Sequence, residues 1–213
     1  MNGGATPRPR GAILHAAARY DAQVWLFTLG RERAFRRKIL SLAHLEAGEA
    51  VLDVGCGTGS LAIEAKRQVG SSGPVHGIDA SPEMLARADK KAQRAGLEIH
   101  FASAPAQALP FADGRFDTVL VTLVLHHLPR SSREQCACEM RRVLKPGGRV
   151  LAVDFGHSAL ESGGFLKHFH RHGHVKSADL LALLSDAGLR VIDSGPVGVG
   201  NLQFVLASTR FGS

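Results

Sequence analysis

The chain has 213 residues, 45% of them hydrophobic, which suits one globular domain with a sizeable core and no apolar run long enough to span a bilayer. Its net charge of +7 means that basic residues outnumber acidic ones. This excess of positive charge is compatible with a solvated basic surface or with binding to an anionic membrane or a nucleic acid. Three cysteines cannot form a disulfide framework, and the spacing of Cys136 and Cys138 places them on different sides of a helix, so we expect a reduced, cytoplasmic protein.

The N-terminal part is predicted to lie outside the main sheet. Residues 1–11 are rich in Gly and Pro and are expected to form a disordered tail. Two helices are predicted after it, over about 12–28 and 31–45, and Gly30 suits the end of the first. The apolar face of the second helix is expected to consist of Phe35, Ile39, Leu42 and Ala43. Its cationic face, turned outward, would consist of Arg33, Arg36 and Arg37.

From residue 50 onward, short apolar runs alternate with helical patterns. Strands are predicted at 50–54, 74–78, 97–101, 117–122, 148–154, 189–194 and 202–207. Helices are predicted at 58–68, 82–95, 132–143 and 178–187. This alternation predicts an α/β fold with a doubly wound, Rossmann-like sheet of seven mostly parallel strands. The last two strands are joined by a short connection, SGPVGVG, so they are expected to pair antiparallel at one edge.

The stretch VLDVGCGTG, residues 51–59, ends the first strand and opens the first helix of this sheet. In such a fold, ligands bind at the carboxyl ends of the strands, and glycines let the backbone approach them closely. Asp53 precedes the glycines by two residues, where it would repel a pyrophosphate but could hold a cationic ligand. Position 60 is Ser, whereas a dinucleotide-binding loop has Gly or Ala there.

Asp79 ends the second strand, 20 residues beyond Gly59. A carboxylate at this position can accept hydrogen bonds from both hydroxyls of a ribose. The other interpretation is an acid that favours the N-terminus of the helix beginning at Pro82. Ribose binding is favoured because Asp79 directly ends an apolar run.

Five motifs stand in the order and spacing of a known family: VLDVGCGTG, GIDASPEML, ALPFADGRFD, LHHL and RVLKPGGRVL. Over residues 50–155 the chain resembles the class I S-adenosylmethionine-dependent methyltransferases. It is most similar to the branch of ubiquinone/menaquinone-biosynthesis C-methyltransferases and bacterial phospholipid N-methyltransferases. The upstream stretch AARYDAQVWLFTLGRERAFRR resembles this branch too. The resemblance implies S-adenosylmethionine as cofactor and a single methyltransferase domain over 12–213, with helices at 12–45 as a lid.

The resemblance also implies roles for single residues. The glycine loop would cradle the methionine half of the cofactor, Asp53 its ammonium, and Asp79 its ribose. The full set of implied cofactor contacts is Asp53, Gly55, Gly57, Thr58, Gly59, Asp79, Ala80, Met84, Ala106 and Thr122. Members of the family usually carry Asp or Asn where this chain has Pro105. The adenine contact would then fall to the amide of Ala106, unless Ser103 or Gln107 replaces the missing side chain.

Methyl transfer requires an aligned acceptor and, where the acceptor carries a proton, a base. His126 and His127 follow the fourth strand, and a histidine titrates near neutrality. The alternative is that LHHL packs and caps a helix. Asp154 ends the fifth strand, where it could orient a donor or cap a loop.

Histidines alternate with other residues in the segment GHSALESGGFLKHFHRHGH, residues 156–174. Imidazoles at alternating positions could bind a metal. A loop that covers the acceptor is favoured instead, with no metal, because quinone and amine substrates need none. His168 and His170 are therefore assigned to the substrate, and so is Tyr20, because the N-terminal helix pair is expected to turn it toward the pocket.

The acceptor is expected to be small or lipid-like, such as a quinone-like ring or a phospholipid or amine headgroup. The basic face of helix 31–45 could contact an anionic membrane. An RNA or DNA methyltransferase is a weaker alternative, because its Pro-Pro-aromatic and Pro-Cys motifs are absent and aromatic residues make up only 6%. A nicotinamide-dependent oxidoreductase is disfavoured by Asp53 and the loop spacing. The oligomeric state is left open.

Overall fold

The computed structural model describes residues 32–156 and 177–209. The predicted tail, the predicted helix at 12–28 and most of the histidine-rich segment lie outside these residues. The helices are α2 Glu32–Ala43, α3 Ser60–Val69, α4 Pro82–Arg94, the short 3₁₀ helix η1 Leu125–His127, α5 Arg130–Val143 and α6 Ser177–Asp186. The strands are β1 Val51–Val54, β2 Val75–Asp79, β3 His100–Ser103, β4 Phe116–Thr122, β5 Leu144–Phe155, β6 Arg190–Pro196 and β7 Leu202–Ser208.

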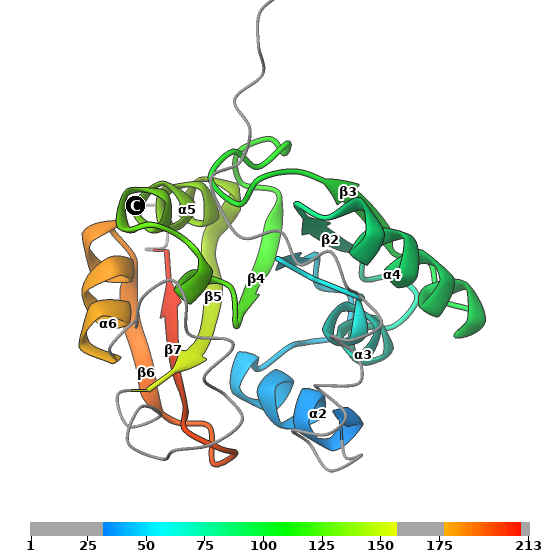
Figure 1. Ribbon diagram of the computed structural model, residues 1–213, viewed down its shortest axis with the longest axis horizontal. Coiled ribbons are helices and arrows are strands. Elements are labelled where there is room, and N and C mark those ends of the chain that lie inside the picture. Colours follow the sequence, from blue (N-terminus) through cyan, green and yellow to red (C-terminus); the bar gives the residue numbers. More distant parts are fainter. Residues whose placement is uncertain (1–31, 157–176, 210–213) are drawn as a thin grey trace, which may run out of the picture.

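The seven strands form one sheet in the order β3-β2-β1-β4-β5-β7-β6 (Figure 1). The strands β1 to β5 pair in parallel, which confirms the predicted doubly wound fold. The antiparallel pairing expected at one edge is present between β6 and β7. Strand β7 also pairs antiparallel with β5, so β6 is the edge strand. The strand order reverses between β1 and β4, where a sheet of this kind binds its ligand.

The sheet is covered on both faces, and each face has its own apolar core. One core joins the sheet to α5 and α6, and the other joins it to α2 and α3. Side chains alternate along a strand, so Leu52 faces the first core while Val51 faces the second. By the same alternation Asp53 of β1 lies on the α2 face, and Asp154 of β5 lies on the α5 face.

Strand β3 begins later than predicted, at His100 instead of residue 97. The reason is the end of α4, where Gly96 has a φ of 64° and Leu97 N donates to Ala92 O at 3.0 Å. This capping turn uses the residues that were assigned to the strand.

The prediction that Arg36 points outward was wrong. The residue is only 7% exposed, whereas Arg33 and Arg37 are exposed as expected. Arg36 lies four residues before Leu40 and seven before Ala43, which are both buried, so it belongs to the same stripe of the helix.

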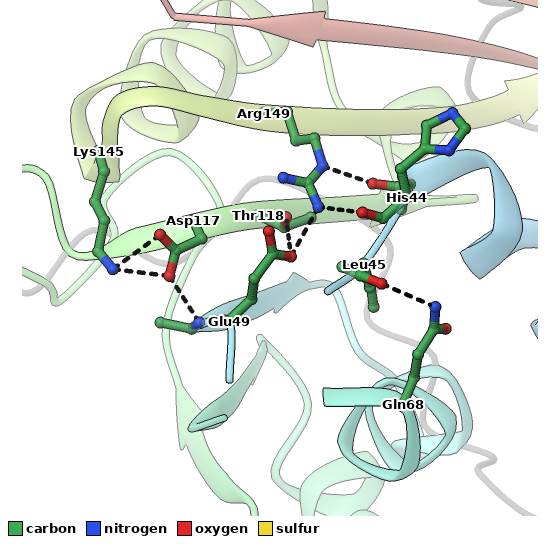
Figure 2. Close-up of polar contacts among 10 residues, drawn as sticks. His44, Leu45, Glu49, Gln68, Asp117, Thr118, Lys145 and Arg149 are labelled. Carbon is green, nitrogen blue, oxygen red and sulfur yellow. Dashed lines mark hydrogen bonds and ion pairs between the residues drawn. The ribbon is translucent and has the colours of Figure 1, made fainter. Parts of the chain in front are cut away.

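The C-terminal end of α2 is fastened to the sheet by Arg149 (Figure 2). Its Nε donates to Ala43 O at 2.6 Å, and its Nη2 donates to His44 O. The same guanidinium pairs with Glu49 at 2.8 Å, and Glu49 accepts a hydrogen bond from Thr118 of β4. The last carbonyls of a helix have no partner within it, so these bonds both satisfy them and fix the position of α2 along the sheet.

We expect the variant Arg149→Met to lower the free energy of unfolding by about 1–3 kcal/mol, because Glu49 loses its ion pair and two backbone carbonyls lose their donor. Urea denaturation measures the difference. Arg94→Met, at an exposed position of α4, is the control for loss of one cation. Equal unfolding midpoints for the two variants would contradict the assignment.

Candidate active site

The loop between β1 and α3 depends on its glycines. Gly55, Gly57 and Gly59 have φ angles of 70°, 53° and 76°, which L side chains rarely adopt. A Cβ on Gly55 would lie 2.3 Å from a methyl carbon of Val124, in the loop that follows β4. The two loops therefore touch through bare backbone at the carboxyl ends of β1 and β4.

Asp79 ties this loop to the next strand. Its Oδ2 accepts a hydrogen bond from Gly57 N at 2.9 Å, and its Oδ1 accepts one from Ser81 N at 2.8 Å. Burial raises the pKa of Asp79 above its ordinary value, and these amide bonds act against the rise. Each carboxylate oxygen keeps acceptor capacity, so the side chain can still receive ribose hydroxyls.

Asp53 is a carboxylate in the interior of the protein. It is 2% exposed, and its Oδ2 has no hydrogen-bond partner in the described part of the chain. Burial raises its pKa from 3.8 to about 7, while the nearby charge of Arg36 and a bond from the amide of Ala62 lower it. An unpaired buried oxygen of this kind is a site for a cation or a hydrogen-bond donor.

Beside this loop, on the other face of the sheet, His126 and Asp154 form a buried pair. His126 Nδ1 lies 2.7 Å from Asp154 Oδ1, and Asp154 Oδ2 accepts a bond from His126 N at 3.1 Å. Oδ1 also accepts from Phe155 N at 2.8 Å. A carboxylate only accepts, so Nδ1 donates to Asp154, and in the neutral form of the ring Nε2 has the free electron pair. The arrangement is that of an oriented proton acceptor.

Comparison with known proteins places these features in a family. A family model described as a methyltransferase domain matches residues 51–148. The chain is 34% identical over 168 residues to a ubiquinone/menaquinone biosynthesis C-methyltransferase of Bdellovibrio bacteriovorus, covering 78% of this chain and 70% of that protein. The chain belongs to the S-adenosylmethionine-dependent methyltransferases.

A second relative agrees with this assignment, and a solved structure shares the fold. The chain is 39% identical to a demethylmenaquinone methyltransferase of Thermus thermophilus over 65% of this chain and 62% of that protein. The fold matches a crystal structure of a SAM-dependent methyltransferase from Aquifex aeolicus, with a TM-score of 0.74, 24% identity, and coverage of 90% of this chain and 96% of that one. The chain thus spans from 60% to 70% of the length of several curated relatives.

The cofactor of this methyltransferase, S-adenosylmethionine, fits the polar atoms that the fold leaves unpaired. Four buried side-chain atoms lack a hydrogen-bond partner among residues 32–156 and 177–209, namely Arg36 Nε, Asp53 Oδ2, Thr122 Oγ1 and His126 Nε2. Three of them belong to the ends of β1 and β4 or to η1 directly after β4. Between them, Leu123 has a φ of 59°, a strained conformation for a branched side chain. Unpaired polar atoms and local strain together mark a ligand site.

The structure places the remaining predicted residues as follows. Thr58 is buried, and its hydroxyl accepts a bond from Lys91 Nζ at 2.8 Å. The ring of His127 is tilted against that of His126, with centroids 3.9 Å apart. Met84 is buried, Ala106 is half-buried, and Ala80 and Pro105 are exposed. Their contacts with the cofactor stay predictions. Tyr20, His168 and His170 lie outside the described residues.

Other expectations concern membranes, cysteines and metals. No helix of the described ranges is long and apolar enough to cross a membrane. Cys136 is buried and Cys138 exposed, which confirms that they lie on different sides of α5. No cluster of metal-binding side chains occurs between residues 32 and 156 or between 177 and 209. The histidine-rich segment is outside those ranges.

Sequence reasoning missed the placement of two side chains near the glycine loop. Arg36 had a usable signal, since its spacing from Leu40 and Ala43 puts it on the buried stripe of α2. Lys91 had none, because its bonds to Thr58 and Ser60 join positions more than thirty residues apart, as the separations of 33 and 31 show.

We predict that Asp53→Asn changes how stability depends on pH. The pKa of Asp53 is raised on folding, so the wild-type protein loses stability as pH rises from about 4 through about 7, where the buried group ionises. Asparagine does not ionise. Between pH 5 and pH 8 the variant should therefore gain about 2–3 kcal/mol relative to wild type, measured by urea denaturation without cofactor.

The variant Asp89→Asn, at an exposed position of α4, controls for loss of one acidic charge. A stability difference between Asp53→Asn and wild type that is the same at both pH values would show that Asp53 is not a buried, ionising carboxylate.

Proposed function

We propose that this methyltransferase moves a methyl group from S-adenosylmethionine to a quinone-like ring. The two relatives compared above carry names that refer to ubiquinone and menaquinone, which supports the acceptor class. A phospholipid or amine headgroup is the second acceptor class within the same branch. The observation that carries the proposal is the His126–Asp154 pair, because it supplies a base at the carboxyl end of β4.

In this proposal the carboxylate of Asp53 holds the ammonium of the cofactor, and Asp79 holds its ribose. Bound S-adenosylmethionine supplies a methyl group on a positively charged sulfur, which makes that carbon electrophilic. The site has two neighbouring carboxylates, Asp53 and Asp79, and each favours a positive charge close by. The glycine loop allows the backbone to approach the ligand without side chains in between.

His126 would take the proton of the acceptor at Nε2. A ring carbon that carries a neighbouring hydroxyl becomes a stronger nucleophile when this hydroxyl loses its proton. His126 is 7% exposed, and its Nε2 is buried without a partner among the described residues. This nitrogen could therefore accept a proton in a site with little water. Asp154 is a positioning residue, since it fixes the tautomer and orientation of the ring and stabilises the imidazolium.

We expect His126→Gln to reduce kcat with a demethylated quinol by about 10²–10⁴-fold at pH 7. The affinity for S-adenosylhomocysteine, measured by calorimetry, should stay within about threefold, because His126 is not assigned to the cofactor. Transfer of a labelled methyl group gives the rate. His100→Gln, at an exposed position of β3, is the matched control.

Asp154→Asn tests the positioning role. The amide of asparagine can donate to Nδ1 and so move the ring proton to Nε2, where it blocks the base. The variant should lower kcat and alter the pH profile without changing KM for the cofactor. A wild-type rate in His126→Gln, or methyl transfer to RNA in place of quinols and headgroups, would overturn the proposed function.

We also propose, on sequence alone, that the chain forms one domain over residues 12–213 with a lid at 12–45. Tyr20, His168 and His170 would contact the acceptor. Of this lid the structure describes α2, which packs on α3 and the sheet. The cytoplasm is the proposed location.

Peripheral contact with an anionic membrane is proposed for the outer face of α2. Arg33 and Arg37 are 61% and 63% exposed, and both pair with Glu64, which also pairs with Arg67. One carboxylate thus faces three guanidinium groups, which leaves a positive surface.

Sedimentation with vesicles tests this contact. The wild-type protein should bind phosphatidylglycerol-containing vesicles several-fold better than pure phosphatidylcholine, since each basic residue near the surface contributes about 1 kcal/mol. The double variant Arg33→Gln, Arg37→Gln should lose this preference, and Lys90→Gln, Arg94→Gln on exposed positions of α4 should keep it. Binding that does not depend on anionic lipid would remove the proposal.

A further inference from the structure

Arg36 is a buried cation with incomplete pairing. Its side chain is 8% exposed, and its nearest carboxylate is Glu32 Oε1, 3.6 Å from Nη2. Nε has no hydrogen-bond partner in the described ranges. A guanidinium has five N–H donors, and burying one of them without an acceptor is unfavourable unless a ligand supplies it.

Arg36 lies on the same face of the sheet as Asp53. Residues Phe35, Ile39 and Leu40 of α2 share one apolar core with Val51 of β1, and Asp53 follows Val51 by two positions. The two charged side chains are close enough for Arg36 to lower the pKa of Asp53. No hydrogen bond or ion pair joins them within residues 32–156, and each retains an unpaired buried atom.

Two buried side chains of opposite charge that do not pair with each other can bind the two charged groups of one zwitterionic ligand. The methionine half of S-adenosylmethionine ends in an ammonium and a carboxylate on one carbon. Asp53 suits the ammonium, and a guanidinium suits the carboxylate because its planar N–H groups match two oxygens at once.

We propose that Arg36 binds the α-carboxylate of the cofactor and forms, with Asp53, a clamp for the amino-acid zwitterion. This inference rests on the proposed role of Asp53. It adds a selectivity, because nucleosides that lack the carboxylate should bind poorly even when they fill the adenine and ribose sites.

The position of α2 is fixed in a way that suits this role. Arg149 holds the carbonyls of Ala43 and His44 at one end of the helix, and Glu64 of α3 pairs with Arg33 near the other. Arg36 lies between these anchors. A preorganised donor loses less freedom when the ligand binds.

Calorimetry with two product analogues tests the clamp. S-adenosylhomocysteine carries the full zwitterion, and S-adenosyl-3-thiopropylamine is the same compound without the carboxylate. Wild-type protein should bind the second about 10–100-fold more weakly, which corresponds to the loss of a charged hydrogen-bond pair. Arg36→Gln should weaken S-adenosylhomocysteine by a similar factor and leave the decarboxylated compound within about twofold.

Two further variants complete the design. Arg37→Gln removes the neighbouring, exposed cation of the same helix and should bind both compounds as wild type does. Arg36→Met keeps an apolar side chain of similar length in the buried position. It replaces Arg36→Gln in the binding measurements if that variant does not fold. Urea midpoints establish that each variant is folded.

Equal binding of the two analogues by wild type would overturn the clamp. So would an Arg36 variant that weakens both analogues by the same factor, since that result shows Arg36 shaping the loop instead of contacting the carboxylate. If wild type binds neither analogue, the role proposed for Asp53 and the glycine loop fails as well, and this outcome is distinct from a failure of Arg36 alone.

Discussion

The carboxylate of Asp53 is buried, and one of its oxygens has no hydrogen-bond partner among the described residues. It lies where the strand order of the sheet reverses, between β1 and β4. Burial of such a group is unfavourable, and its pKa near 7 expresses this. The surroundings reduce the penalty in part, through the charge of Arg36 and the amide of Ala62 at the start of α3. A bound cation next to Asp53 would reduce the remaining penalty of burying this carboxylate. Both α2, through Arg36, and the start of α3, through Ala62, therefore contribute to the electrostatics of this carboxylate.

Because side chains alternate along a strand, the polar residues at the strand ends lie on two different faces of the sheet. Asp53 and Thr122 lie on the face covered by α2 and α3, with Arg36 above them. Asp154 lies on the opposite face and holds His126, which follows β4 in η1. The proposed cofactor contacts and the proposed base thus lie at neighbouring strand ends but on opposite faces of the sheet. A change on one face can therefore leave the other intact.

The pattern of the sequence was sufficient for the fold and for the position of the glycine loop within it. The alternation of apolar runs and helices predicted seven strands, and the loop with Asp53 was placed correctly at the end of β1. Strand β3 was misplaced because a capping turn at Gly96 used residues that look equally apolar. Arg36 was assigned to the outer face of α2 together with Arg33 and Arg37, although its spacing places it among the buried residues of the helix. The role of Lys91 beside Thr58 gave no local signal.

The sequence by itself determined the elements, their order and the chemical types gathered at the glycine loop. Those properties depend on local periodicity and on backbone conformations that only glycine adopts easily. Tertiary structure alone decided which polar atoms stay unpaired, that His126 meets Asp154 across 28 positions of the chain, and that the charge of Arg36 lies near Asp53. These facts depend on which strands become neighbours and on how a helix is rotated against the sheet. Both are set by packing over the whole domain, because burial of one side chain is favourable only in relation to all the others around it.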